Sequence, residues 1–411
     1  MHLPGNRFLH WRYWLIGLFG LVIRTQSAAQ FTRLGSEQTG ISFENRLTET
    51  EENNVIEYDY FYNGAGIAVG DLNNDGLPDL YFTGNMIPDK LYLNKGKLRF
   101  EDVSGKAGVG LGAGWKTGVT LVDINADGWL DIYVCYSGHG SPEERRNRLY
   151  INNHTGKGRI PTFTEQAAAY GLDLPGYSTQ AVFLDYDKDG DLDCFLLNHN
   201  VNHFTRFDPA LSETVRDEFA GDYLFRNNGP QKKFEDVSEE CHIKGSPHML
   251  PADNRRQKLL QSAENYELYQ NVVRSGFGHQ YMRNMLQLNN GNTRTQTVGK
   301  AVPTFSEIGQ LAGISNTDWS WAPLAADFDN DGWKDLYVSN GFLRDYTNMD
   351  FLKFYADSVM KASHNRPAAM MDMVRKMPST ATTSYIFRNR SGDVEPGTSP
   401  GRLTFENKVA A

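Results

Sequence analysis

The sequence predicts an all-β protein, a β-propeller built from four-stranded blades. Three observations predict it: a pattern of strands and turns that recurs along the chain, strands that are apolar on both faces, and a suitable composition. The 411 residues include 39 Gly, 23 Phe and 20 Tyr, a mixture that favours many short strands joined by tight turns. With 40% hydrophobic and 22% charged residues, the chain has the composition of a folded globular protein.

The repeat is clearest in a nine-residue acidic segment that follows a short apolar stretch and precedes a strand-like one. Its four copies are DLNNDGLPD (71–79), DINADGWLD (123–131), DYDKDGDLD (185–193) and DFDNDGWKD (327–335). A third segment such as KLYLNKG and a fourth such as LRFEDVS complete a unit of four strands, in which the acidic loop joins the first two. The first copies begin 52 and 62 residues apart, which suits a four-stranded propeller blade.

The strands that follow the acidic loops are apolar on both faces. Leu80 and Phe82 point to one side of the predicted strand and Tyr81 points to the other. A sheet with one wet face would alternate apolar and polar residues, whereas a sheet between two other sheets is apolar on both sides. The pattern therefore favours a radial stack of sheets.

The repeats set the expected organisation of the chain. We expect blades at about 64–109, 114–173, 177–243 and 319–409, a half-blade at about 286–314, and helical insertions at about 251–284 and 344–377. Both insertions carry apolar residues at helical spacing. They either pack on the rim of the propeller or contact a ligand directly.

The N-terminus reads as an export signal. Arg7 and Arg12 precede the apolar run 14–23, and the small residues 27–29 then offer a cleavage site. We therefore expect residues 1–29 to be a signal peptide, with a retained membrane anchor as the alternative, and the mature protein to be extracellular, periplasmic or on the cell surface. Three cysteines without metal-ligand spacing indicate small buried residues rather than a disulfide scaffold.

The acidic loops are predicted calcium sites, because oxygen ligands without His or Cys select Ca²⁺ over transition metals. Positions 1, 3 and 5 offer side-chain oxygens, position 7 a backbone carbonyl, and position 9 a carboxylate that can bind through both oxygens. The candidate ligands are Asp71, Asn73, Asp75, Leu77 and Asp79; Asp123, Asn125, Asp127, Trp129 and Asp131; Asp185, Asp187, Asp189, Asp191 and Asp193; and Asp327, Asp329, Asp331, Trp333 and Asp335. We expect about four calcium ions with a mainly structural role.

Two other interpretations of the loops fit the sequence less well. An EF-hand needs a Glu at position 12 and flanking helices, but position 12 is Phe82, Val134, Leu196 or Val338. A plain Asp-Gly hairpin turn does not require four oxygen ligands at a fixed spacing. The four loops contain more aspartates than the formal net charge of −9 of the whole chain requires, so the negative charge is concentrated in the loops. No basic stripe suggests nucleic-acid binding.

These loops and strands resemble the FG-GAP/VCBS-type repeats of integrin-α-like propellers, including secreted bacterial proteins similar to cartilage acidic protein. The resemblance extends over 31–411. It implies an extracellular or periplasmic ring of seven blades that acts in adhesion or ligand binding, with calcium held by the loop aspartates. This chain has only about four and a half recognisable blades, so we expect an incomplete ring. Open ends of such a ring would favour self-association.

Other candidate sites are weaker. The HNVNH segment has zinc-like spacing at His199 and His203 but no helical pattern, so we interpret it as a polar loop. Trp115, Trp319 and Trp321 precede acidic loops, where they are buried between blades or stack on a sugar.

No catalytic residue is predicted, since no Ser/His/Asp set, phosphate loop or separate carboxylate pair stands out. The preferred function is a secreted, calcium-stabilised module that binds an extracellular protein or polysaccharide. The alternatives are a calcium-dependent polysaccharide-degrading enzyme and a non-functional fragment.

Overall fold

The computed structural model describes most of the chain beyond the N-terminal segment. The described residues are 33–199 except 56, 59 and 111–113; 201; 219–239 except 230–232; 283–294; 301–391 except 319, 342, 346–347, 349, 357, 360–365 and 380; and 404–408. The expected signal peptide and nearly all of the expected insertion 251–284 lie outside these residues. Among the helices that the structure describes, none is long and apolar enough to cross a membrane.

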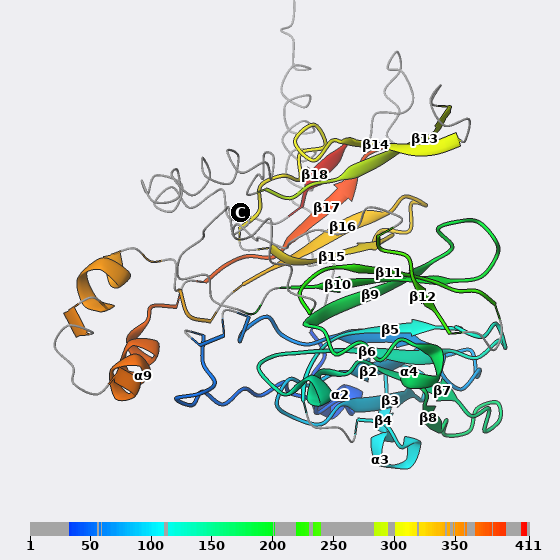
Figure 1. Cartoon of the computed structure of the whole chain (residues 1–411), viewed down its shortest axis with the longest axis horizontal. Coiled ribbons are helices and arrows are strands. Elements are labelled where there is room, and N and C mark those ends of the chain that lie inside the picture. The colour runs from blue at the N-terminus through cyan, green and yellow to red at the C-terminus, as the bar shows by residue number, and fades with distance from the viewer. Residues whose placement is uncertain are drawn as a thin grey trace, which may run out of the picture.

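Four antiparallel sheets of four strands form propeller blades, as predicted (Figure 1). Blade 1 contains β1 (Ile67–Gly70), β2 (Asp79–Phe82), β3 (Lys90–Asn94) and β4 (Phe100–Asp102). Blade 2 contains β5 (Trp115–Val122), β6 (Asp131–Ser137), β7 (Arg148–Asn152) and β8 (Phe163–Glu165). Blade 3 contains β9 (Ser178–Leu184), β10 (Asp193–Asn198), β11 (Tyr223–Arg226) and β12 (Glu235–Asp236). Blade 4 contains β15 (Ser320–Ala326), β16 (Asp335–Asn340), β17 (Tyr385–Asn389) and β18 (Phe405–Asn407).

In every blade the spatial order of the strands follows the chain, so consecutive strands pair. A separate two-stranded sheet, β13 (Gln287–Arg294) and β14 (Ala301–Glu307), lies in the segment where a half-blade was expected. The all-β propeller of four-stranded blades is thus confirmed for the described part of the chain.

Within the described residues, helices are few and short. They are α2 (Ser36–Thr39), α3 (Ser104–Ala107), η1 (Pro142–Arg145), α4 (Ala167–Tyr170), η2 (Phe351–Ala356) and α9 (Arg366–Lys376). α3 and α4 are single turns that follow the fourth strand of blades 1 and 2, and each ends at a glycine in the left-handed conformation. η2 and α9 lie in the segment 344–377, where a helical insertion was expected, and they project to one side of the stacked sheets (Figure 1).

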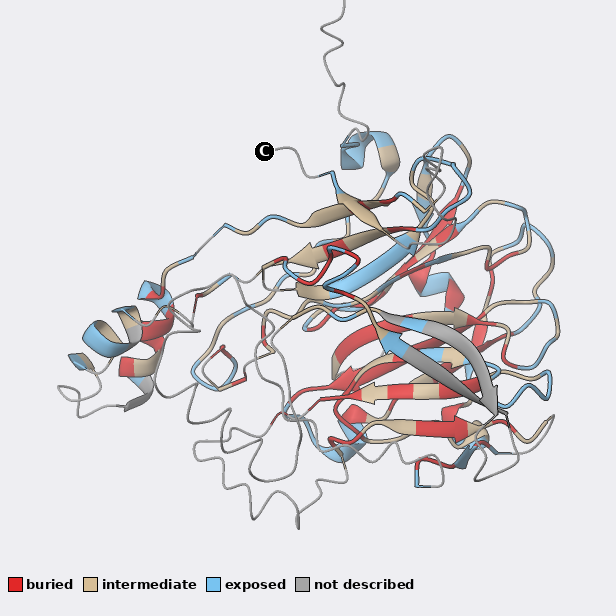
Figure 2. Cartoon of the chain, turned by 90° about the horizontal axis from the view of Figure 1, so that it is seen from above, coloured by how far each residue is buried: buried red, intermediate tan, exposed pale blue. Residues whose placement is uncertain are grey.

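The core lies between neighbouring blades, which explains the apolar character of both strand faces. One cluster joins blades 1 and 2 through side chains such as Tyr81, Leu91 and Ile132. A second joins blades 2 and 3 and includes Cys135 and Cys194, both buried and free. All seven residues of β6 are buried, because blade 2 is covered on both faces. Figure 2 shows the buried residues following the stacked sheets.

The first strands of blades 1, 3 and 4 have more exposed apolar side chains than that of blade 2, and on β9 of blade 3 Val182 is 46% exposed. Ile67 and Val69 on β1 are 55% and 61% exposed, and Leu324 on β15 is 55% exposed. Ile308 and Leu286 beside the two-stranded sheet pack against blade 4. Exposed apolar side chains on first strands are therefore not confined to the blades at the ends of the described set.

Candidate metal centre

All four acidic loops occupy the same place in their blades, between the first and second strands. Each loop needs two left-handed residues. The glycine at position 6 has φ of 91°, 84°, 101° and 89° in loops 1 to 4. Position 4, which sequence reasoning did not single out, has φ of 55° to 66° and holds Asn74, Ala126, Lys188 and Asn330. Two left-handed residues fold the loop back on itself, so that oxygens at separate positions approach each other.

The aspartate at position 1 organises each loop. In loop 1, Asp71 accepts the backbone N–H of Asp75 at 3.1 Å through Oδ1 and that of Gly76 at 2.7 Å through Oδ2. The same pair of hydrogen bonds forms in loops 2, 3 and 4. The position-5 carboxylate in turn accepts the N–H of position 7 in every loop. Local hydrogen bonding therefore fixes these two carboxylates before any ion binds.

The aspartate at position 9 begins the second strand and is buried in all four blades: Asp79, Asp131, Asp193 and Asp335 are 0% to 2% exposed. Its Oδ2 accepts the N–H of position 2, for example Leu72 at 2.9 Å. Its Oδ1 accepts the N–H of the last residue of the third strand, or of the residue after it, at 2.8 Å in each blade. Burial raises the pKa of Asp79 to about 6 and that of Asp131 to about 7, although these N–H donors lower it.

That third-strand donor is an asparagine in each blade: Asn94, Asn152, Asn227 and Asn389. Its side-chain Nδ2 donates to the carbonyl of loop position 8 at 2.9 to 3.2 Å, and its Oδ1 accepts an N–H two residues further on. Sequence reasoning missed this residue. The signal was the Asn that ends KLYLN, RLYIN, YLFRN and YIFRN.

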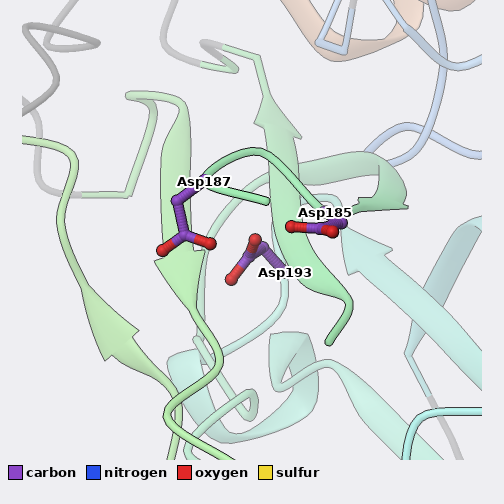
Figure 3. Close-up of side chains that lie close together, drawn as sticks. All are labelled: Asp185, Asp187 and Asp193. Carbon is purple, nitrogen blue, oxygen red and sulfur yellow. The ribbon is translucent and has the colours of Figure 1, made fainter. Parts of the chain in front are cut away.

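The structure brings together part of the predicted ligand set. In loop 3 the carboxylate oxygens of Asp185, Asp187 and Asp193 lie within 4.8 Å of one another, and they face one another in Figure 3. In loop 4 the same positions, Asp327, Asp329 and Asp335, converge in the same way. Position 5 is not part of either trio. In loops 1 and 2 position 3 is Asn, so that trio of carboxylates cannot form.

The donor set fits a calcium ion. Hard oxygens converge in loop 3, and no basic side chain of the described chain pairs with its three clustered carboxylates. Asp191, at position 7 of the same loop, also carries a buried Oδ1 that accepts no hydrogen bond. Leu77, Trp129 and Trp333 occupy position 7 elsewhere and offer only a backbone carbonyl. Buried carboxylate oxygens without donors are stabilised by a cation.

Two loops have a basic side chain against them. In loop 2, His154 Nε2 lies 2.8 Å from Asp127 Oδ2. In loop 4, Arg388 Nε lies 2.8 Å from Asp329 Oδ2 and its Nη2 lies 3.3 Å from Asp331 Oδ2. The four loops share a backbone conformation but differ in their surrounding charge.

The structure describes His199 and Val201 of the HNVNH segment, which the sequence suggested is a polar loop, and both side chains are buried. His199 is 3% exposed, and its Nε2 lies 2.6 Å from Ser137 Oγ and 3.4 Å from the Tyr58 hydroxyl. Burial lowers the pKa of His199 to about 3, so the ring is neutral. Tyr58 and Tyr60, distant in sequence, pack against the His199 ring, with ring centroids 6.2 Å and 4.0 Å away. His203 lies outside the described residues.

A pocket of about 610 Å³ lies at the strand ends of blades 1 and 2 remote from the acidic loops. Its walls include Trp115, Lys116, His139, Glu52 and Glu144. Trp115 is partly buried against Tyr58 and Phe61, with ring centroids 5.4 Å away in both cases. Of the other two tryptophans, Trp321 donates from Nε1 to the carbonyl of Gly341, and Trp319 is outside the described residues.

Comparison with known proteins agrees with this architecture. Residues 71–134 match the family model of the FG-GAP-like repeat. The chain is 31% identical over 136 residues to cartilage acidic protein 1 of Xenopus tropicalis, which covers 33% of this chain and 20% of that protein. It is 28% identical over 168 residues to the human protein of that name, covering 41% and 23%.

The chain is also 33% identical over 146 residues to integrin alpha-4 of Xenopus laevis, covering 31% of this chain and 14% of that protein. The matches therefore span less than a quarter of these relatives. Neither of the two names is that of an enzyme. Residues 71–134, which contain the first two acidic loops of the propeller, match the FG-GAP-like repeat, and parts of the chain are similar in sequence to cartilage acidic protein 1 and integrin alpha-4.

Proposed function

We propose that this protein is a secreted binding module whose propeller is stabilised by calcium in the acidic loops. The observation that carries the proposal is the fourfold recurrence of one loop conformation, with three carboxylates converging in loops 3 and 4. Charges of one sign at this distance repel one another unless a cation lies among them.

The four loops differ in how closely their candidate calcium ligands already converge. In loop 3, Asp185, Asp187 and Asp193 already converge, and the position-7 carbonyl and Asp189 complete an all-oxygen set of the kind calcium prefers. The position-9 oxygens each keep a lone pair beyond the N–H bonds they accept. Calcium would neutralise the loop carboxylates and fix the start of each second strand.

Chelation tests this role directly. At a calcium concentration about 100 times the dissociation constant, each site adds about 2.7 kcal/mol to the free energy of unfolding. Removal of calcium with EDTA is therefore expected to lower the melting temperature of the full chain, and excess calcium to restore it. Magnesium at the same concentration serves as the control. A melting curve that is the same in calcium and in EDTA would refute the stabilising role.

The binding function is inferred from the relatives and from the absence of a recognised catalytic set among the described residues. We place ligand contact at the pocket of 610 Å³, because it joins an aromatic ring with polar side chains at an interface of two blades. The proposed ligand is an extracellular protein or a polysaccharide. Secretion is part of the proposal, and it rests on the predicted signal peptide.

Incubation with a panel of polysaccharides in millimolar calcium, followed by size-exclusion chromatography, tests the binding module. Co-elution of intact chains names a glycan ligand, and its loss in Trp115→Ala but not in Trp333→Ala assigns it to the pocket. Separate elution of intact chains directs the search to protein partners. Shortened chains would overturn the binding module and support the alternative, a polysaccharide-degrading enzyme.

A further inference from the structure

We propose that Arg388 is a built-in counter-ion of loop 4 that competes with calcium, so that this loop is the weakest of the four calcium sites. The inference rests on the proposed binding of calcium by the acidic loops. It predicts different calcium affinities for loops that have the same sequence pattern.

The position of Arg388 follows from the strand that carries it. Arg388 precedes Asn389, whose backbone N–H donates to Asp335 Oδ1 at 2.8 Å, so the strand is fixed against the loop. The guanidinium then reaches Asp329 Oδ2 at 2.8 Å and Asp331 Oδ2 at 3.3 Å. Its side chain is 33% exposed, which leaves a path to solvent.

These contacts use carboxylates that calcium would need. Asp329 belongs to the converging trio with Asp327 and Asp335. A guanidinium on its Oδ2 neutralises part of the charge that attracts an ion, and it repels a second cation at close range. Calcium can enter loop 4 with a full ligand set only when Arg388 moves away. Binding there is weakened by the cost of breaking these contacts.

Blade 3 shows that an arginine at this strand position does not by itself form an ion pair with the acidic loop. Arg226 occupies the equivalent place beside loop 3, but it donates to Glu235 Oε2 on the neighbouring strand at 2.9 Å. In blade 4 the cross-strand partner of Arg388 is Glu406. Glu406 is already paired with Arg390 at 3.5 Å and with Lys408 at 2.8 Å.

The remaining blades have no cation at this position. The corresponding residues of blades 1 and 2 are Leu93 and Ile151, whose side chains are buried. Among the described residues, an arginine against an acidic loop is thus specific to blade 4; the basic side chain against loop 2 is the imidazole of His154, which contacts one carboxylate, that of Asp127. Asp329 and Asp331 are held by an internal cation when calcium is scarce.

Calorimetric titration of the calcium-free full chain with calcium tests the inference, with Arg388→Leu as the variant and Arg226→Leu as the matched control. We expect one site of the wild type to bind at least tenfold more weakly than the others. Arg388→Leu should tighten that site at least tenfold, and Arg226→Leu should leave the titration unchanged. Arg388→Gln, which keeps a polar side chain, repeats the test if the Leu variant does not fold.

A second measurement separates competition from general damage. Arg388→Leu should lower the melting temperature in EDTA, where the counter-ion is lost, and leave it unchanged or higher in saturating calcium. Equal affinity at all sites, together with an unchanged titration in Arg388→Leu, would overturn the inference while calcium binding stands. The lack of any calcium binding in wild type and variants would instead refute the proposed function on which it rests.

Discussion

Asn152 is predicted to be the most sensitive of the third-strand asparagines, because it alone among those described joins two blades. Its Nδ2 donates to the carbonyl of Leu72 in loop 1 at 2.9 Å and to that of Leu130 in loop 2 at 3.2 Å. Its Oδ1 accepts the N–H of His154 at 3.1 Å. The residue is 2% exposed, so water cannot replace these partners after truncation.

The expected cost follows from the hydrogen bonds removed. Each contributes about 0.5–1.5 kcal/mol, and a carbonyl left buried without a donor costs more than the average. Asn152→Ala is therefore expected to lower the free energy of unfolding by about 2–4 kcal/mol. Asn227→Ala removes a hydrogen bond to Leu192 at 3.2 Å and one from Gly229 at 3.1 Å, both within blade 3. It should cost about 1–2 kcal/mol.

Urea unfolding of the full chain in calcium buffer measures the difference, with the two variants compared at equal protein concentration. Asn94→Ala, which also breaks only contacts within its own blade, provides a second control. If Asn152→Ala is no more destabilising than the two controls, the link between the loops of blades 1 and 2 does not contribute to stability and the reasoning fails.

Two further predictions concern single residues. The pKa of His199 is about 3 in the folded state and about 6.5 in the unfolded state. Below pH 6.5 the unfolded state therefore binds more protons, and the contribution of His199 to stability falls on acidification. Between pH 7 and pH 5 this loss in the free energy of unfolding is about 2 kcal/mol. Urea unfolding at both pH values should show this loss as the difference between the wild type and His199→Gln, because Asp79 and Asp131, whose raised pKa values act in the opposite direction, are present in both proteins; an equal pH dependence of the two proteins would contradict it. Ala126 has φ of 55° at position 4, where loops 1 and 4 hold Asn. Since Asn tolerates this conformation better than Ala, Ala126→Asn should raise the free energy of unfolding by about 0.5–1 kcal/mol, and Asn330→Ala should lower it by a similar amount; unchanged unfolding midpoints for both would show that position 4 is not strained.

The sequence by itself determined the repeat, the fold class and the place of each acidic loop. It could do so because four copies of DxxxDGxxD, each between apolar strands, carry local information: turn residues, strand period and glycine at position 6 all act within a few residues. The two-stranded sheet β13–β14 was expected for the same reason, since the sequence of that segment contains only two of the four strand patterns of a blade.

Only the tertiary structure decided how the loops differ. Arg388 lies 53 residues after Asp335, and Glu235 and Glu406 direct two equivalent arginines to different partners. Asn152 reaches Leu72 across a blade boundary, and His199 is buried by a segment about 140 residues earlier. These contacts join residues far apart in the chain, and no local pattern encodes them. The spacing of residues in the nine-residue loops therefore predicts the positions of the candidate ligands, whereas packing between strands and blades determines which charged side chains surround each loop.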